Sequence, residues 1–175
     1  GRTGLSGRGS HSKWGPNFAI DSLITRFWQG PDGKESFQML AERRPNFQHG
    51  IPGAMRVRSE KEGDTELSWK IEALKREVRS SPAVGTQTKL FDDLFSAMEK
   101  KAEADAQDVP IFEGQTDDPR DTDNAWVETQ VLHYHMDARL AEMFDNIPKA
   151  VTEGERSARL EWIDCNRISE PRFAG

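Results

Sequence analysis

Cysteine is nearly absent from this sequence, which contains only Cys165. An internal disulfide and a cysteine-rich zinc site are therefore excluded, and a reducing compartment is the simpler expectation. Long apolar runs are absent too. No stretch approaches the roughly 20 residues of a membrane-spanning helix, and no basic-then-apolar segment opens the chain. We therefore expect this segment to make no membrane contact of its own.

Positive charge is also in short supply. The 24 lysines and arginines are outnumbered by 30 aspartates and glutamates, which gives a formal net charge of -6 over 175 residues. Because phosphate backbones bind basic surfaces, nucleic acid is not the expected partner. Hydrophobic residues make up 35% of the chain and include five Trp and nine Phe. This content predicts a single globular domain with a core of ordinary size.

The spacing of apolar residues predicts both strands and helices. Strands are expected over 18–28, 36–44, 109–114, 125–136 and 158–164, and helices over 65–81, 86–105 and 138–147. Pro52 and Gly53 predict a loop over 45–55, and the acidic stretch 116–125 predicts another. Because strands and helices do not strictly alternate, the pattern indicates a mixed α/β fold.

A glycine-rich segment, "GRTGLSGRGSHSKWGPN" at 1–17, precedes the first predicted strand. Its glycines predict a flexible or irregular arm. They do not form a dinucleotide-binding fingerprint, because no strand precedes them and no helix follows. We assign 1–17 to this arm and 18–175 to the folded domain. The chain opens without Met and closes on "EPRFAG", so we expect it to be a piece of a longer polypeptide.

The end of the helix predicted over 65–81 has the spacing of a metal-binding site but lacks two of the carboxylates that such a site needs. Glu77, Ser80 and Ser81 share one face, because residues i, i+3 and i+4 are neighbours on a helix. Three glutamates there would suit Mg²⁺, which prefers carboxylate and water oxygens. Serine hydroxyls are neutral, and Pro82 disfavours the helical conformation at Ser81. Most of the metal affinity is therefore expected to be gone.

These residues resemble a degenerate Nudix box. In that motif a glycine is followed after five residues by Glu, and after seven more by Arg-Glu, an apolar residue, any residue and Glu-Glu. Ala54 stands at the motif glycine and Glu60 follows at the matching distance. About eight extra residues then precede "REVRSS" at 76–81, which ends in hydroxyls where the motif has Glu-Glu.

Two further segments carry a more specific resemblance, "FEGQTDDPRDTDNAWVET" at 112–129 and the arm's "GRTGLSGRG" with "WGPN". They are similar to the mitochondrial-type ADP-ribose pyrophosphatases and to the Nudix-homology domain of the ADP-ribose-gated melastatin-type (TRPM) cation channels. The resemblance is weakest between 55 and 110, and it lacks the family's N-terminal cap region and terminal helix. It implies the Nudix fold, a mixed β-sheet sandwiched between helices.

By position, the resemblance implies that Asp118 and Arg120 hold the ribose and phosphates of ADP-ribose. A carboxylate and a guanidinium fork suit those groups. Asn124 and Trp126 are expected to fix this loop on the sheet, and Asn124 is counted among the ligand-site residues. Phe18 stands where the family commonly has His. An apolar or stacking contact is therefore expected at Phe18. Phe173 falls roughly where the family has a Tyr beside the ligand, so stacking without the hydroxyl is expected there.

Three alternatives at these sites stay open. The charged residues of the loop, which are Asp117, Asp118, Arg120, Asp121 and Asp123, are also of the kind that merely cap and staple a surface turn. The acidic insertion 60–66 either supplies substitute carboxylates or is a solvated loop. His133 and His135 share a strand face and form either a metal site or ordinary sheet packing.

Three functions stay open as well. The favoured one is a binding module that senses ADP-ribose for a larger channel or enzyme polypeptide, with hydrolysis weak or absent. The second is a Mg²⁺-dependent pyrophosphatase giving AMP and ribose 5-phosphate, with Glu60 and Glu77 as its remaining catalytic and metal-binding residues. The third is a structural remnant that binds only protein. A channel domain would lie on the cytoplasmic side of a membrane, and a free enzyme in mitochondria or cytosol.

Overall fold

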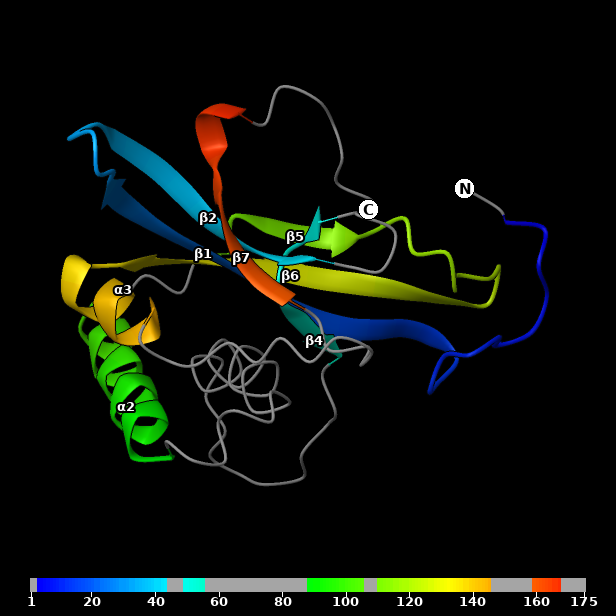
Figure 1. The fold of residues 1–175 in the computed structure, drawn as a ribbon. Helices are drawn as coiled ribbons and strands as arrows, with labels where there is room; N and C mark the ends of the chain where they lie inside the picture. The colour runs from blue at the N-terminus through cyan, green and yellow to red at the C-terminus, as the bar shows by residue number, and fades with distance from the viewer. Residues whose placement is uncertain (1–2, 44–48, 56–87, 106–109, 146–158, 168–175) are drawn as a thin grey trace.

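The computed structural model describes residues 3–43, 49–55, 88–105, 110–145 and 159–167. Within these ranges a twisted sheet carries two helices near one end of its long strands (Figure 1). The strands are β1 (Gly15–Gln29), β2 (Glu35–Arg43), β3 (His49–Gly50), β4 (Gly53–Met55), β5 (Phe112–Gln115), β6 (Ala125–Met136) and β7 (Arg159–Asp164). The helices are α2 (Thr88–Asp105) and α3 (Ala138–Asp145), with a 3-10 turn η2 (Cys165–Arg167).

The sheet is built around β1. Its strand order is β3-β2-β1-β6-β5, with β4 also paired to β1 and β7 to β2. β1 runs parallel to β6 from Gly15↔Ala125 to Arg26↔Met136, whereas its pairings with β2 and β4 are antiparallel. Because β1 and β6 start level with each other, the segments that lead into them meet at one end of the sheet.

The hydrophobic core lies between one face of the sheet and both helices. Ile24, Leu40, Tyr134 and Met136 come from that face of β1, β2 and β6, since successive strand residues point to opposite faces. The helices contribute the rest of this buried cluster, namely Leu94, Phe95, Met98, Leu140, Ala141 and Phe144. No helix in the described part of the chain is long and apolar enough to cross a membrane.

A partly buried polar network closes the edge of this core. Arg26 of β1 is 5% exposed, donates to Asp145 at the end of α3 and to Gln38 Oε1 at 2.9 Å, and lies 4.0 Å from the ring centre of Trp162. The indole of Trp162 donates to Asp145 Oδ1 at 2.9 Å. The Arg26 guanidinium therefore links β1, β2, α3 and β7, and the Asp145 carboxylate compensates its charge.

α3 begins where a side chain can cap it. Asp137 Oδ1 accepts the Leu140 N–H at 2.9 Å, and the Ala141 N–H donates to the Asp137 carbonyl at 2.9 Å. Asp is a favoured residue at this position because its carboxylate satisfies an otherwise unpaired amide of the first turn.

Most elements lie where the sequence predicted them, and the mixed α/β class is confirmed. β6 spans the predicted range, and β1 and β5 differ from theirs by up to three residues at their ends. β2, β7, α2 and α3 agree with theirs to within one residue over the part of the chain that the structure describes. The loop predicted over 45–55 is wrong at 49–50 and 53–55, where β3 and β4 form. Pro52 does interrupt them, but its carbonyl accepts the Ser22 N–H at 2.8 Å, so the break stays attached to β1. The helix predicted over 65–81 lies outside the described residues.

Gly53 in β4 is required by a close approach to β1. The backbones of Gly53 and Asp21 are paired, and a Cβ on Gly53 would overlap Asp21 Oδ1 and lie 3.2 Å from the Ile20 carbonyl oxygen. The other oxygen of Asp21, Oδ2, accepts the Thr129 hydroxyl at 2.8 Å. Gly53 therefore allows Ala54, the first residue of the degenerate motif, to lie against β1.

Truncation of Phe95 tests the position of the core. The side chain is 1% exposed and packs in the cluster between the helices and the sheet. We expect Phe95→Ala to lower the free energy of unfolding by about 3–5 kcal/mol, because the lost contacts add to a cavity that relaxes only in part. Urea unfolding followed by circular dichroism measures this loss. Ser96→Ala, at the exposed neighbouring position, is the control, and equal stability of the two variants would contradict the described core.

Candidate ligand-binding site

The loop between β5 and β6 turns sharply at "DPRD". The Asp121 N–H donates to the Asp118 carbonyl at 2.9 Å, which closes a four-residue turn with Pro119 in its second position. Proline suits that position because its fixed φ is already that of the turn. The turn presents Asp118 and Arg120 together, two residues apart, at the end of the sheet away from α2 and α3.

Asp118 and Arg120 form a two-bond ion pair. Arg120 Nε donates to Asp118 Oδ1 at 2.7 Å and Nη2 to Oδ2 at 2.6 Å, while the Arg120 backbone N–H also donates to Oδ1, at 2.9 Å. The side chains are 17% and 48% exposed, respectively. The hydrogen bond to Arg120 holds the pKa of Asp118 below its ordinary value, and the bond to Asp118 raises the pKa of Arg120. Both groups are therefore charged, preorganised and open to solvent on the arginine side.

Asp121 and Thr122 anchor the same loop from beneath. Asp121 is 7% exposed and its Oδ1 accepts the Val127 N–H of β6 at 3.0 Å. The Thr122 hydroxyl accepts the Ala125 N–H at 2.9 Å and donates to the Gly7 carbonyl of the arm at 2.7 Å. Asp121 therefore fixes the loop to β6, which is the structural role considered as an alternative for the acidic residues of this loop.

The arm lies along this loop rather than apart from it (Figure 1). Asp123 Oδ1 accepts the N–H groups of Thr3 and Gly4 at 2.6 and 3.2 Å, and the Asp123 N–H donates to the Leu5 carbonyl at 2.9 Å. The bond from the Thr3 backbone keeps the pKa of Asp123 below its ordinary value. The arm was predicted to be flexible or irregular. Up to the start of β1 at Gly15 its described residues form no helix or strand, and hydrogen bonds join it to the loop.

Gly9 shows why the arm carries glycine. Its φ is +57°, and a Cβ there would lie 3.1 Å from Thr122 Cγ2 and 3.4 Å from the Arg120 carbonyl oxygen. A side chain is disfavoured both by the left-handed backbone and by this approach to the loop. Gly9 thus allows the arm to lie close to the loop.

Asn17 secures the point where the arm becomes β1. It is 1% exposed, and its Oδ1 accepts the Ser12 hydroxyl at 2.9 Å and the Lys13 N–H at 3.1 Å. Its Nδ2 donates to the carbonyls of Lys13 and Gly15 at 3.0 and 3.1 Å. A single buried amide therefore fixes the arm's final turn.

Three further predicted residues of this end, Phe18, Asn124 and Trp126, differ from one another in their contacts. Phe18 is 43% exposed, and Lys13 Nζ lies 4.7 Å from its ring centre. Asn124 does join the loop to its surroundings, since its Oδ1 accepts the Gly7 N–H at 3.1 Å and its carbonyl accepts the Gly15 N–H at 2.8 Å. Trp126 does not hold the loop through its indole, which donates along β6 to Glu128 at 2.9 Å.

The residues predicted to bind metal are not among those that the structure describes. Glu60, Glu77, Ser80, Ser81 and the acidic insertion 60–66, like Phe173, lie outside the described residues. Within the described ranges, no group of three or more His, Cys, Asp or Glu side chains is placed to hold a metal ion. Without further carboxylates from that insertion, Glu60, Glu77 and two neutral hydroxyls do not match the negative donor set that a pair of Mg²⁺ ions requires.

His133 and His135 converge on a hydroxyl. The hydroxyl of Thr25 lies 2.8 Å from His133 Nε2 and 3.0 Å from His135 Nδ1, and Phe27 and Phe37 flank the ring of His135. Burial, followed by repulsion from His135, lowers the pKa of His133. Thr25 and the aromatic rings give both histidines sheet-packing partners, in line with the non-metal alternative.

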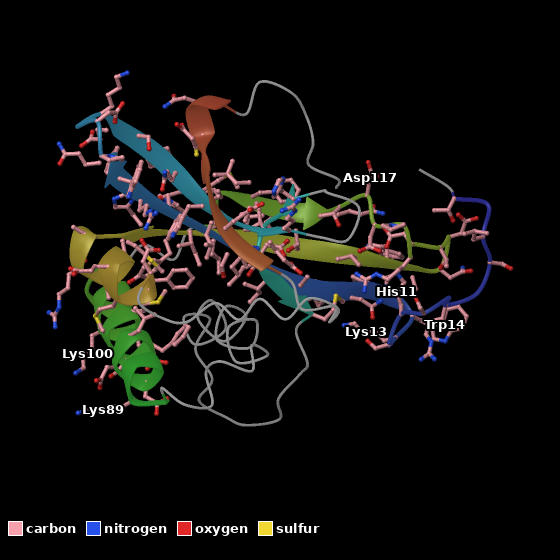
Figure 2. All side chains as sticks on the ribbon, in the orientation of Figure 1. His11, Lys13, Trp14, Lys89, Lys100 and Asp117 are labelled. Atoms are coloured by element: carbon pink, nitrogen blue, oxygen red, sulfur yellow. The ribbon has the colours of Figure 1, made fainter. Side chains whose placement is uncertain are left out.

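Sequence reasoning missed the buried histidine of this end. His11 is 4% exposed, and its Nε2 lies 3.2 Å from Asp121 Oδ1. Figure 2 places His11, Lys13 and Trp14 at the Asp117 end of the sheet, opposite Lys89 and Lys100 on α2. A single histidine in an irregular glycine-rich segment has no periodicity, and so nothing in the sequence pairs it with a carboxylate 110 residues away.

Comparison with known proteins confirms the resemblance to the Nudix proteins. No protein-family model matches the chain. Curated relatives do: it is 34% identical over 178 residues to the mitochondrial ADP-ribose pyrophosphatase of Rattus norvegicus, covering 95% of this chain and 47% of that protein. It is 33% identical over 175 residues to the putative nudix hydrolase 6 of Caenorhabditis elegans, covering 99% of this chain and 57% of the relative.

Channel proteins are also among its relatives. The chain is 30% identical over 171 residues to a transient receptor potential cation channel subfamily M member-like 2 of Nematostella vectensis, covering 93% of this chain and 10% of the channel. The chain thus spans about half the length of the two enzyme-type relatives and a tenth of the channel. The chain is therefore similar both to enzyme-type Nudix relatives and to a short part of a channel protein.

A solved structure is more distantly similar. It is the NUDIX domain of Shewanella oneidensis NrtR in complex with ADP ribose, with a TM-score of 0.40 and 13% identity, covering 86% of this chain and 74% of that one. At this TM-score the likeness supports no inference about the site.

The Asp118–Arg120 pair predicts a pH-dependent contribution to stability. Because the folded-state pKa of Asp118 is lowered from 3.8, its contribution is present above that value and is lost as pH falls through the lower folded pKa. We expect Asp118→Asn to cost at most about 1 kcal/mol at pH 7, since Arg120 is half-exposed and solvent screens the pair. Urea unfolding between pH 7 and pH 2 measures the difference, which should vanish at the acid end. A difference that stays constant with pH would contradict the described ion pair.

Proposed function

We propose that this chain is a Nudix-homology domain that binds ADP-ribose and reports its occupancy to a larger polypeptide, with hydrolysis weak or absent. The observation that carries the proposal is the Asp118–Arg120 pair, which is charged, held on a loop anchored from two sides, and half-open to solvent on its arginine. The relatives support the ligand class, because one is named an ADP-ribose pyrophosphatase. The channel relatives support a sensing role as part of a longer chain.

The remaining hydrogen-bonding capacity of the pair suits ADP-ribose. Arg120 uses two of its five side-chain N–H groups on Asp118, and three stay available for a diphosphate. Asp118 receives three donors from Arg120 and, with two carboxylate oxygens, has room to accept about one more, such as a ribose hydroxyl. A guanidinium already fixed by a carboxylate loses less freedom when it binds an anion.

The first alternative is an active Mg²⁺-dependent ADP-ribose pyrophosphatase that gives AMP and ribose 5-phosphate. The enzyme-type relatives favour it, but Ser80 and Ser81 stand where the motif has two carboxylates. The second alternative is a structural remnant that binds only protein, which the replacement of the family's His by Phe18 favours. In a channel the domain would lie on the cytoplasmic side of the membrane, and as a free enzyme in mitochondria or cytosol.

Calorimetry followed by product analysis separates the three functions. ADP-ribose is titrated into the domain, and the mixture is then incubated with Mg²⁺ and analysed for AMP by chromatography. Heat without AMP agrees with the proposed sensor, AMP at ordinary enzymatic rates refutes it in favour of the enzyme, and no heat leaves the structural remnant.

Arg120→Ala tests the ligand contact itself. We expect ADP-ribose affinity to fall by at least about tenfold, because hydrogen bonds between a guanidinium and phosphate oxygens are charge-assisted. Arg139→Ala is the matched control, since Arg139 is an exposed arginine on α3, near the opposite end of the sheet. Equal affinity of the two variants would mean that the loop is structural only.

Restoring the motif tests the account of lost hydrolysis. We expect the triple variant Ser80→Glu, Ser81→Glu and Pro82→Ala to raise Mg²⁺-dependent AMP release by orders of magnitude, because carboxylates supply the negative charge that the ions need. The single change Pro82→Ala is the control for the helix ending. If the triple variant gains no activity, the identification of Ser80 and Ser81 with the metal-binding pair is wrong.

A further inference from the structure

We propose that His11 is a positioning residue for the ADP-ribose site. Through it, the glycine-rich arm holds the turn that carries Asp118 and Arg120. The proposal rests on the proposed function. His11 touches neither Asp118 nor Arg120 through a hydrogen bond. It acts through Asp121, whose carboxylate anchors and whose backbone N–H closes the turn that carries both residues.

The His11–Asp121 pair is buried on both sides. The side chains are 2% and 7% exposed, and His11 Nε2 lies 3.2 Å from Asp121 Oδ1. The same oxygen accepts the Val127 N–H at 3.0 Å. A carboxylate oxygen accepts hydrogen bonds, so this contact requires the histidine tautomer whose Nε2–H donates to Asp121. One oxygen thus joins the arm, the loop and β6.

Asp121 in turn fixes the ligand-facing pair. Its backbone N–H closes the turn by donating to the Asp118 carbonyl at 2.9 Å, and Arg120 is the residue of the turn that directly precedes Asp121 in the chain. A displacement of Asp121 therefore displaces both members of the ion pair. The arm's backbone contacts with Thr122, Asp123 and Asn124 lie further along the loop and cannot replace this one.

Loss of the imidazole leaves the carboxylate short of a partner. A buried carboxylate with one donor instead of two is destabilised, because its desolvation is no longer compensated. The turn relieves this by moving Asp121 toward water, and Asp118 and Arg120 move with it. We therefore expect an effect on ligand affinity from a residue that never meets the ligand.

The two amide replacements of histidine make a matched pair. In His11→Gln the side-chain amide nitrogen falls about where Nε2 stands, whereas in His11→Asn it falls about where Nδ1 stands. Only the first can donate to Asp121 from the arm as it lies. A role limited to filling space would not separate the variants in this order, because the rescue depends on the position of one N–H group.

ADP-ribose affinity by calorimetry on the 175-residue chain gives the first readout. We expect His11→Asn to weaken binding about tenfold, the scale of one hydrogen bond to a charged group, and His11→Gln to stay within about twofold of the parent. Ser10→Ala, at an exposed neighbouring position of the arm, is the control. In an Asp121→Ala background, His11→Asn should cause little further loss, since both act through one contact.

Amide hydrogen exchange without ligand gives the second readout. The Val127 N–H reports the position of the Asp121 carboxylate, and the Asp121 N–H reports the closed turn. Both should exchange faster in His11→Asn and at the parental rate in His11→Gln, while the Ile24 amide in the middle of β1 is unchanged in either. Uniformly faster exchange would mean global destabilisation and would overturn the positioning role.

The two proposals fail in different ways. If the parent chain binds ADP-ribose and His11→Asn binds it equally well, the role of His11 is refuted and the proposed function stands. If the parent chain gives no heat with ADP-ribose, the proposed function falls, and this role for His11 falls with it whatever the exchange rates show.

Discussion

The parallel pairing of β1 with β6 is the constraint on which the rest of the described structure depends. The two strands are in register from Gly15↔Ala125 to Arg26↔Met136. Strands that run in the same direction and start level deliver the segments before them to the same place. The arm before β1 and the loop before β6 therefore meet at one end of the sheet, although more than 100 residues separate them in sequence.

That meeting turns two irregular segments into one polar structure. Neither has a ladder of its own, so their backbone groups find partners in each other. Thr122, Asp123 and Asn124 bond to the backbone of the arm, and Asp121 contacts the His11 side chain. The side chains that accept these bonds are short and cannot bridge a wider gap. Glycine at position 9 is what allows the arm to come close enough. A rigid scaffold with a functional loop at its end is a common arrangement for binding sites.

The opposite end of the sheet carries the stability. There the apolar residues of β1, β2 and β6 pack on both helices, and Arg26 ties the edge of this core to α3 and β7. The hydrophobic core therefore lies at the other end of the sheet from the arm and the loop (Figure 1). This separation also means that variants in the arm and the loop can be tested with the core left intact.

The strands and helices could be predicted because their signal is periodic. β6 was placed from alternation and α2 from its apolar stripe, and both signals are local in sequence. β3 and β4 could not be predicted, because strands of two and three residues beside a proline carry no periodic pattern. The loop that carries Asp118 and Arg120 stands out in the sequence only through its resemblance to other proteins. The partners of its residues do not stand out, because a hydrogen bond such as that of His11 with Asp121 leaves no trace in local composition.

By itself the sequence determined the mixed α/β class, the positions of most of the long elements and the relation to Nudix proteins. Only the tertiary structure decided that Asp118 and Arg120 face each other, that Asp121 is buried, and that the arm completes the loop. The reason is physical: local periodicity records which face of an element is buried, whereas contacts between distant irregular segments exist only once parallel strands have brought them together.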